Sequence, residues 1–236
     1  MERSHFLKSL LVGSLSVPAL LAACSKDNEI TPTTGSTGTA GAGNCNVAPT
    51  ETEGPFPTKV PSSYVRSDIR DGKEGYFMKA IITITNTNSN CAALAGAFVD
   101  IWHCDAAGNY SEYGGGGMQS ANYQGVHFLR GRQVTDANGQ VTFTTIFPGW
   151  YNGRATHIHV HVYSASGTSL KVTQIAFPEG SGTALAAVNG YSKGLSGYTY
   201  HQNDNVFSDG VSQELATVTG NTSNGFDLAI TFGVAA

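Results

Sequence analysis

The amino-acid sequence predicts an all-β domain, and three of its properties lead to this conclusion. Segments rich in Val, Ile, Thr, Tyr and Phe are separated by short turns that contain Gly, Asn or Asp. No long stretch carries apolar residues at helical spacing. Glycine is abundant, with 29 residues, whereas only 13% of the residues are charged. Together these properties favour many short strands joined by turns, as in a β-sandwich.

The first 23 residues predict export. Arg3 and Lys8 form a basic start, an apolar run follows over residues 10–21, and Leu-Ala-Ala precedes Cys24. The apolar run is too short to span a membrane as a helix. A cysteine in this position resembles the bacterial lipoprotein box, in which it is acylated and becomes the new N-terminus. We therefore expect a lipoprotein signal peptide over 1–23 and lipidation at Cys24, which would anchor the exported protein to a bacterial cell membrane or outer membrane. An ordinary secretory signal cleaved nearby is the alternative.

Residues 24–44 predict a flexible tether, because they are rich in Thr, Gly, Ser and Ala and hold no large apolar residue after Ile30. Residues 45–236 remain, which suffice for one domain with a full core. The whole sequence has 13 basic and 17 acidic residues. Removal of the signal peptide takes away Arg3, Lys8 and Glu2, so the mature chain would have 11 basic and 16 acidic residues, a net charge of −5 with His neutral. With no basic patch in the sequence, nucleic acid is not an expected partner.

The first predicted elements lie between residues 51 and 104. Residues 51–57 form an irregular arm, because Pro55 and Pro57 exclude regular structure. Apolar side chains recur at every second position over residues 75–86, which predicts a strand with Met78 and Ile82 among the residues on one side. Residues 97–104 form the next strand, in which Trp102 is expected to face the core.

The second half of the domain continues the same pattern. Residues 127–134 and 140–146 form a hairpin, because Asn138-Gly139 is a strong turn signal. A long turn over 147–153 leads directly into a strand over 154–163, and a further strand covers 169–177. Residues 184–188 could form one short helical turn, and strands over 214–218 and 225–234 close the domain. Seven to nine strands indicate an immunoglobulin-like or prealbumin-like β-sandwich with long irregular loops and an N-terminal arm.

Three cysteines remain once Cys24 is assigned to lipid. An exported protein is expected to hold a disulfide, and Cys45, Cys91 and Cys104 allow three single pairings. We favour Cys45–Cys91, because this bond would attach the incoming arm to the strand region. Cys104 would then be a buried thiol.

The strand over 154–163 carries the most distinctive pattern of the chain. His157, His159 and His161 occupy alternate positions, so their imidazoles share one face of a strand. Branched apolar residues occupy the other face: Ile158, Val160 and Val162. Neutral imidazole is the commonest metal ligand in proteins, so this face is a candidate metal site. The alternative is a strand of polar histidines that are satisfied by hydrogen bonds.

Two tyrosines join this strand in a family resemblance. Tyr110 lies in WHCDAAGNYS, and Tyr151 lies in FPGWY, six residues before His157. The segments ETEGPFP (51–57), VDIWHCDAAGNYS (99–111), RGRQVTDANGQVTFTTIFPGWYNGRATHIHVHV (130–162) and TQIAFP (173–178) resemble the intradiol ring-cleavage dioxygenases, the catechol and protocatechuate dioxygenase family. They resemble its small exported branch most.

The resemblance implies one mononuclear, non-haem Fe(III) held by Tyr110, Tyr151, His157 and His159. This ligand set suits the ferric ion, because a nearby trivalent cation favours phenolate over phenol. Two phenolates and a hydroxide also cancel its three charges, so the ion can lie in a buried cleft. No Asp or Glu stands at the spacing of a ferrous two-histidine, one-carboxylate site.

The resemblance also implies an activity and its auxiliary residues. The expected substrates are O2 and a small aromatic diol of the catechol type, which would be opened to a cis,cis-muconate-type product. Tyr151 would leave the metal and accept a substrate proton. Arg154 would stabilise charge that develops on the ring, and Gln174 would orient Arg154 or the hydroxide through hydrogen bonds. Pro55 and Phe56 would line the substrate pocket.

Two alternatives belong to other functional classes. The sandwich could be a catalytically inactive lipoprotein that binds a metal or an aromatic ligand. It could instead hold zinc or copper on His157, His159 and His161. The turn between Tyr151 and His157 is short and the helical dimerisation segment of the catechol enzymes is absent, so the natural diol and the oligomeric state stay open.

Overall fold

The computed structural model describes residues 45–236. The predicted signal peptide, the tether and the lipidation residue Cys24 lie outside the described residues. None of the helices within 45–236 combines the length and the apolar character needed to cross a membrane.

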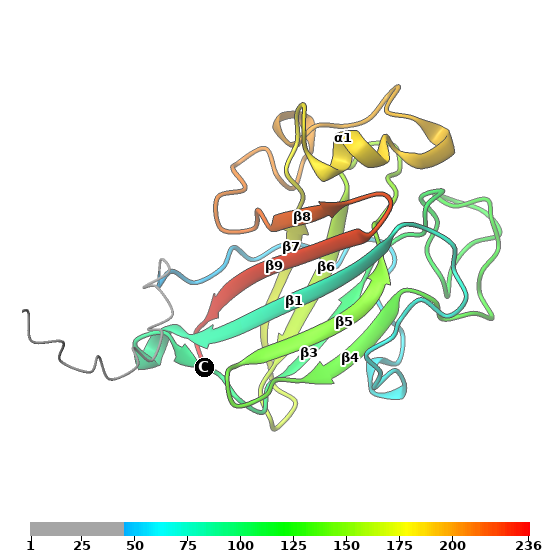
Figure 1. Ribbon diagram of the computed structural model, residues 1–236. Coiled ribbons are helices and arrows are strands. Elements are labelled where there is room, and N and C mark those ends of the chain that lie inside the picture. The colour runs from blue at the N-terminus through cyan, green and yellow to red at the C-terminus, as the bar shows by residue number, and fades with distance from the viewer. Residues whose placement is uncertain (1–44) are drawn as a thin grey trace, which may run out of the picture. The chain divides into compact units, whose positions relative to one another are not determined.

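Two β-sheets face one another in a sandwich (Figure 1). One sheet has the order β2-β1-β9-β8, with β5 also paired to β1, and the other has the order β4-β3-β6-β7. The strands of the first sheet are β1 (Phe77–Asn86), β2 (Ala92–Ala93), β5 (Gln140–Ile146), β8 (Thr217–Asn221) and β9 (Gly225–Val234). Those of the second are β3 (Phe98–Trp102), β4 (Arg130–Val134), β6 (His157–Tyr163) and β7 (Ser169–Ala176). The all-β sandwich that the sequence predicts is confirmed.

Helical structure within the described chain is confined to short segments. The single α-helix, α1 (Ala184–Val188), lies where the sequence suggests one helical turn. The side chain of Thr183 accepts a hydrogen bond from the backbone N–H of Ala186 and caps its start. Four 3-10 turns complete the list: η1 (Pro61–Ser63), η2 (Thr87–Ser89), η3 (Tyr191–Lys193) and η4 (His201–Asn203).

The core lies between the two sheets, where strand alternation places apolar side chains. On β1 the alternating residues Met78, Ala80, Ile82 and Ile84 have no exposed surface. From the other sheet, Ile158, Val160 and Val162 of β6 join the same core. The histidines of β6 therefore point away from the space between the sheets, as the alternation predicts.

Several strand boundaries differ from the sequence-based expectation. The strand expected over 127–134 begins only at Arg130, because Leu129 has a φ of 56° and lies in the left-handed region. The strand expected over 97–104 ends at Trp102. The strand expected over 214–218 lies at Thr217–Asn221, and before it Leu215 makes only an isolated bridge to Ala176.

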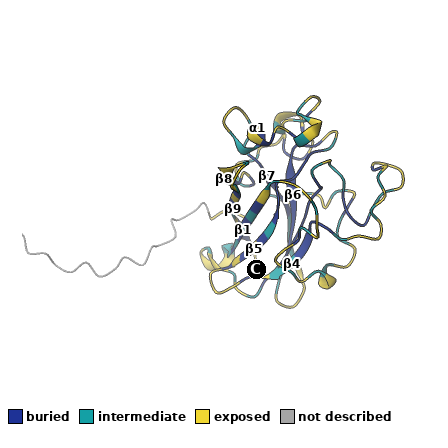
Figure 2. Ribbon diagram, turned by 45° about the vertical axis from the view of Figure 1, so that its right-hand side comes forward, coloured by how far each residue is buried: buried dark blue, intermediate teal, exposed yellow. Residues whose placement is uncertain are grey.

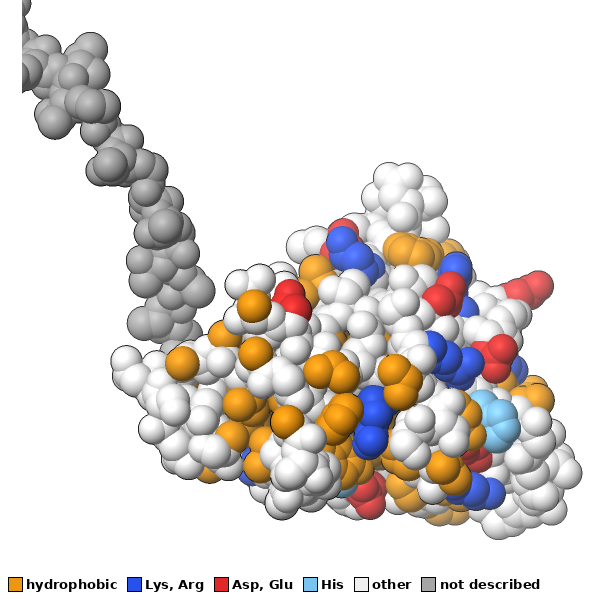
Figure 3. All heavy atoms as spheres, turned by 90° about the horizontal axis from the view of Figure 1, so that it is seen from below, with side chains coloured by type: hydrophobic (Ala, Val, Ile, Leu, Met, Phe, Trp, Pro, Cys, Tyr) orange, Lys and Arg blue, Asp and Glu red, His pale blue; other side chains and the backbone are white. Residues whose placement is uncertain are grey.

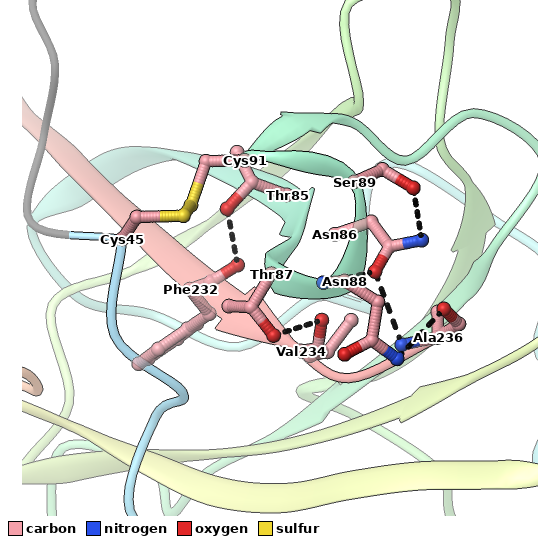
Figure 4. The surroundings of a disulfide bond; sticks show 10 residues. All are labelled: Cys45, Thr85, Asn86, Thr87, Asn88, Ser89, Cys91, Phe232, Val234 and Ala236. Carbon is pink, nitrogen blue, oxygen red and sulfur yellow. Dashed lines mark hydrogen bonds between the residues drawn. A yellow bond between two sulfur atoms is a disulfide. The ribbon is translucent and has the colours of Figure 1, made fainter.

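A disulfide joins Cys45 to Cys91, which is the pairing that the sequence favours (Figure 4). The bond attaches the start of the described chain to the turn between β1 and β2. Beside it, the Thr87 hydroxyl donates to the backbone oxygen of Val234 at the end of β9. Cys104 is a buried free thiol.

Charged side chains form pairs over the surface. On the face shown in Figure 3, basic and acidic groups are interspersed among neutral and apolar ones. Exposed ion pairs include Lys79–Asp227 at 3.3 Å and Arg70–Asp68 at 2.7 Å. Such exposed pairs contribute little to stability, so the buried interactions around β6 are of greater interest.

Candidate active site

The outer face of the β4-β3-β6-β7 sheet carries the histidines. His159 pairs directly with Trp102 of β3 and with Gln174 of β7, and opposite residues of antiparallel strands point to the same face. Trp102 is buried, as expected, but against this polar face: its indole stacks on the His159 ring at 4.9 Å between centroids and 5° between planes. The sheet register therefore places an indole, an imidazole and an amide side by side.

Both faces of β6 are buried, although the sandwich has only two layers (Figure 2). The N-terminal arm covers the histidine face. The backbone N–H of Glu51 donates to the Val172 carbonyl of β7 at 3.0 Å, and Gln174 Nε2 donates to the Thr52 carbonyl at 2.8 Å. The arm thus shields the histidine face from solvent.

Three side-chain donor atoms converge on this face. Tyr110 Oη lies 3.2 Å from His157 Nε2, and His157 Nε2 lies 3.2 Å from His159 Nε2. All three residues have 2% or less of their surface exposed. The two histidines come from one strand, whereas Tyr110 reaches them from the loop after β3.

The orientation of His157 leaves its Nε2 available as a ligand. Its Nδ1 donates to the Ala155 carbonyl at 2.6 Å, so the lone pair is on Nε2, which faces Tyr110. Burial lowers the pKa of His157 well below 6.5, and the nearby Arg154 guanidinium lowers it further. Burial and the neighbouring His157 likewise lower the pKa of His159. Both rings are therefore neutral, the form that binds metals.

The loop that carries Tyr110 is fixed by Gln119. The Oε1 of Gln119 accepts from the Tyr110 backbone N–H at 2.6 Å, and its Nε2 donates to the Tyr110 carbonyl at 2.9 Å. Arg130, at the start of β4, is fully buried and donates to the Ser111 carbonyl at 2.7 Å and to the Phe56 carbonyl at 3.0 Å. Arg130 therefore joins the tyrosine loop to the N-terminal arm.

Tyr151 lies beside these atoms but is less buried than Tyr110. Its ring meets those of Tyr110 and His157 edge-on, each at 5.7 Å between centroids. Burial raises the pKa of Tyr151, and burial together with the neighbouring Tyr151 raises the pKa of Tyr110 well above 10. Without a cation both are therefore neutral phenols.

Arg154 lies in the turn before β6, and its guanidinium is bound on two sides. Its Nη2 donates to Gln174 Oε1 at 2.5 Å, and its Nε lies 3.0 Å from each carboxylate oxygen of Asp204. Its Nη1 lies 3.4 Å from His157 Nε2. Asp204 was absent from the sequence-based site, because it stands 50 residues after Arg154 in a loop without a distinctive motif.

The predicted pocket residues of the arm lie at different depths. Phe56 is buried and stacks on Tyr110 at 4.9 Å between ring centroids, whereas Pro55 is exposed. Gly54 passes so close to the site that a Cβ there would lie 3.0 Å from His159 Cε1. The arm thus brings Phe56 and Gly54 against two of the converging residues and leaves Pro55 outside.

His161 does not join the other two histidines. Its Nδ1 lies 3.0 Å from Glu53 Oε1, and its Nε2 lies 2.7 Å from the Ser169 hydroxyl. Within residues 45–236, no group of three or more His, Cys, Asp or Glu side chains is arranged to hold a metal ion. The converging set instead consists of two histidines and one tyrosine, Tyr110.

The converging atoms fit a single metal ion. Two ligands at right angles around an ion about 2.1 Å from each lie about 3 Å apart, close to the 3.2 Å spacings observed here. Phenolate oxygen is a hard anionic donor, which suits a trivalent ion better than a soft one. Tyr110, His157 and His159 could therefore hold Fe(III), with Tyr151 beside them as a further candidate ligand.

Comparisons with known proteins identify the family of this chain. A family model described as Dioxygenase matches residues 78–216. The catechol 1,2-dioxygenase of Acinetobacter baylyi (strain ATCC 33305 / BD413 / ADP1) is 30% identical over 149 residues, which are 55% of this chain and 46% of that protein. The matched segment thus spans about half the length of this curated relative.

Solved structures show the same fold. An intradiol ring-cleavage dioxygenase from Tetranychus urticae is 26% identical, with a TM-score of 0.69 over 80% of this chain and 95% of its own. The catechol 1,2-dioxygenase of Pseudomonas arvilla C-1 is 21% identical, with a TM-score of 0.52 over 79% of this chain and 62% of its own, a likeness in fold. The family model covers more than half of the sequence and includes β1 except its first residue, β2 to β7 and the whole converging set. The chain therefore belongs to the intradiol ring-cleavage dioxygenase family.

Proposed function

We propose that this chain is an Fe(III)-dependent dioxygenase that opens a catechol-type diol with O2 to a cis,cis-muconate-type product. The observation that carries the proposal is the convergence of three buried donor atoms: Tyr110 Oη and His159 Nε2 each lie 3.2 Å from His157 Nε2. Tyr151 would be the fourth ligand. The chemistry that a bound ferric ion supplies is chelation of the diol and activation of its ring toward O2.

The two tyrosines would have different tasks, since their surroundings differ. Tyr110 is fully buried and its backbone is held by Gln119, so it would remain in place. Tyr151 is partly exposed and lies in the turn before β6, so it can move without opening the core. As a displaced phenolate, Tyr151 would take up one proton of the incoming diol.

Arg154 would stabilise negative charge that develops on the substrate. Its Nη1 is the edge of the guanidinium that faces the converging donors, and the charge lies in a place that is shielded from water. A cation positioned before the reaction begins stabilises such charge more than a mobile one. Gln174 holds the Nη2 edge and so contributes to this orientation.

The test uses protein loaded with ferric iron. We expect a visible absorption band from tyrosinate bound to Fe(III), O2 consumption with a panel of catechols, and ring-opened intradiol products. Tyr110→Phe should remove most of the band, and Tyr151→Phe should shift it, whereas Tyr200→Phe at an exposed position should leave it unchanged.

The outcomes separate the competing functions. Protein that stays colourless after iron loading would exclude the ferric tyrosinate site. A band without O2 consumption across the panel would indicate a binding module that lacks turnover. Extradiol products would contradict the ferric mechanism.

We also propose that the chain is exported and anchored to a bacterial cell membrane or outer membrane through lipid on Cys24. The support is the sequence alone: an apolar segment over 10–21 followed by Leu-Ala-Ala-Cys. Metabolic labelling with a fatty acid should mark the wild-type chain and leave Cys24→Ser unlabelled. Equal labelling of both would exclude this anchor.

A further inference from the structure

Asp204 is a fully buried carboxylate next to the proposed site, and its four contacts are shared between two segments. Oδ1 lies 3.0 Å from Arg154 Nε and accepts from the Val206 backbone N–H at 2.8 Å. Oδ2 also lies 3.0 Å from Arg154 Nε and accepts from the Ala155 backbone N–H at 2.6 Å. Both oxygens are thus satisfied, which is what a buried carboxylate requires.

These contacts determine which edge of the guanidinium is free. A guanidinium has five N–H donors in a rigid plane, so fixing two edges fixes the third. Asp204 takes the Nε edge and Gln174 takes Nη2, which leaves Nη1 facing His157 Nε2. Without Asp204, the amide of Gln174 would be the remaining hydrogen-bond acceptor for the guanidinium, which also lies over the Phe207 ring at 5.6 Å from its centroid.

Asp204 also offsets a charge. The guanidinium lies 3.4 Å from a nitrogen that is a candidate ligand of a trivalent cation, so an uncompensated positive charge there would oppose that cation. The carboxylate on the far edge partly offsets the charge of Arg154 and leaves its Nη1 donors directed at the site. Arg154 thus remains a positioned cation, and its repulsion of a metal ion is reduced.

We propose that Asp204 is a positioning residue of the reaction and acts through Arg154. This inference rests on the proposed dioxygenase function. Asp204 makes no hydrogen bond to the converging donor atoms, so it would act through its partners, the Arg154 guanidinium and the Ala155 backbone that also holds His157 Nδ1. The double variant with Arg154→Lys separates these two routes. The 50-residue separation means that the loop around η4 must be folded before Arg154 can work.

The experiment compares Asp204→Asn, Arg154→Lys and the double variant in the iron-loaded full chain. Asp204→Asn keeps the shape and an oxygen acceptor but removes the charge. We expect kcat to fall on the order of 100-fold, as when one preorganised donor is lost, with little change in KM. Because Lys lacks the fork, the double variant should be no slower than Arg154→Lys alone.

A matched control is available in β3. Asp100 is also buried and binds an arginine with two contacts, Arg132 Nε at 2.5 Å and Nη2 at 2.7 Å, but it touches none of the proposed site residues. Asp100→Asn therefore removes a similar buried pair and should lower stability while leaving kcat within about threefold of wild type.

Three results would overturn the role of Asp204: kcat unchanged in Asp204→Asn, an equal loss of kcat in Asp100→Asn, or multiplicative losses in the double variant. If Asp204→Asn does not fold, Asp204→Glu replaces it, and the same non-additivity with Arg154→Lys is expected. A wild-type protein without a visible band or turnover would instead reject the proposed function. The two failures are therefore distinguishable.

Discussion

Gly54 offers a test of how closely the N-terminal arm controls the site. It has a φ of 67°, in the left-handed region, and a Cβ there would lie 3.0 Å from His159 Cε1 and 3.4 Å from His159 Nε2. Gly54→Ala therefore adds two effects, backbone strain and a steric contact with a proposed metal ligand. Gly72 has a similar φ of 76°, but a Cβ there would meet nothing within 4 Å. Gly72→Ala thus adds the strain alone.

The two variants should differ in stability by the cost of the contact. A non-glycine residue in the left-handed region costs about 1–2 kcal/mol, part of which is offset because alanine restricts the unfolded chain. Both variants carry this cost. In Gly54→Ala the contact is about 0.5 Å shorter than the optimum for carbon atoms, and crowding of this kind typically costs about 1–3 kcal/mol more. The retreat of the His159 ring is limited because Trp102 stacks on it.

The assay has two parts. Urea unfolding of the iron-free proteins should give Gly54→Ala a free energy of unfolding about 1–3 kcal/mol below that of Gly72→Ala. Iron titration followed by visible absorption should show an affinity about 10- to 100-fold weaker for Gly54→Ala, because the ligand ring is displaced, and an unchanged affinity for Gly72→Ala. If the two variants behaved alike in both measurements, the arm would not press on His159 and the placement of Gly54 would be wrong.

Two further predictions concern stability. Replacing Cys45 and Cys91 by Ser removes a crosslink between residues 46 positions apart. The free energy of unfolding should fall by up to about 4 kcal/mol relative to the disulfide-bonded wild type. A fall of less than about 1 kcal/mol would mean that the arm is held by its other contacts. Burial, with the neighbouring Glu51, raises the pKa of Glu214 to about 7 from 4.5, so between these values the folded protein keeps a proton that the unfolded chain has lost. Stability should therefore fall as the pH rises through this window, by at most about 3 kcal/mol, and Glu214→Gln should abolish that dependence in urea unfolding at pH 5 and pH 8.

The strands were predictable where local pattern and tertiary environment agree. Alternation over β1 gives the buried set Met78, Ala80, Ile82 and Ile84. Asn138-Gly139 gives the tight turn between β4 and β5, but the hairpin predicted there is wrong, because β4 pairs with β3 and β5 pairs with β1 of the other sheet. The boundaries were less predictable. Leu129 adopts a left-handed conformation although its side chain carries no signal for it, and this displaces the start of β4. A conformation imposed by packing has no counterpart in a local sequence pattern.

The site was predictable only in part. Motifs and the strand period indicate which residues share a face of a strand, but they do not indicate which residues from other segments contact that face. His157 and His159 share a face because of the strand period alone. That Trp102 stacks on His159 depends on the register between β3 and β6, which is a long-range pairing. Asp204 belongs to a loop without periodicity or motif, so nothing in its neighbourhood connects it to Arg154.

The burial of the histidine face has the largest functional consequence. In a two-layer sandwich one face of each sheet is free to meet water, and polar side chains such as these histidines would be at lowest cost there. In this chain the arm and the loop around Asp204 cover that face instead, and burial keeps His157 and His159 neutral and Tyr110 protonated. Covering polar groups in this way costs stability unless something compensates for it. A trivalent ion on these same donors would supply that compensation, because it converts the phenol to phenolate and satisfies both imidazole lone pairs. Iron should therefore stabilise the folded chain as well as activate it.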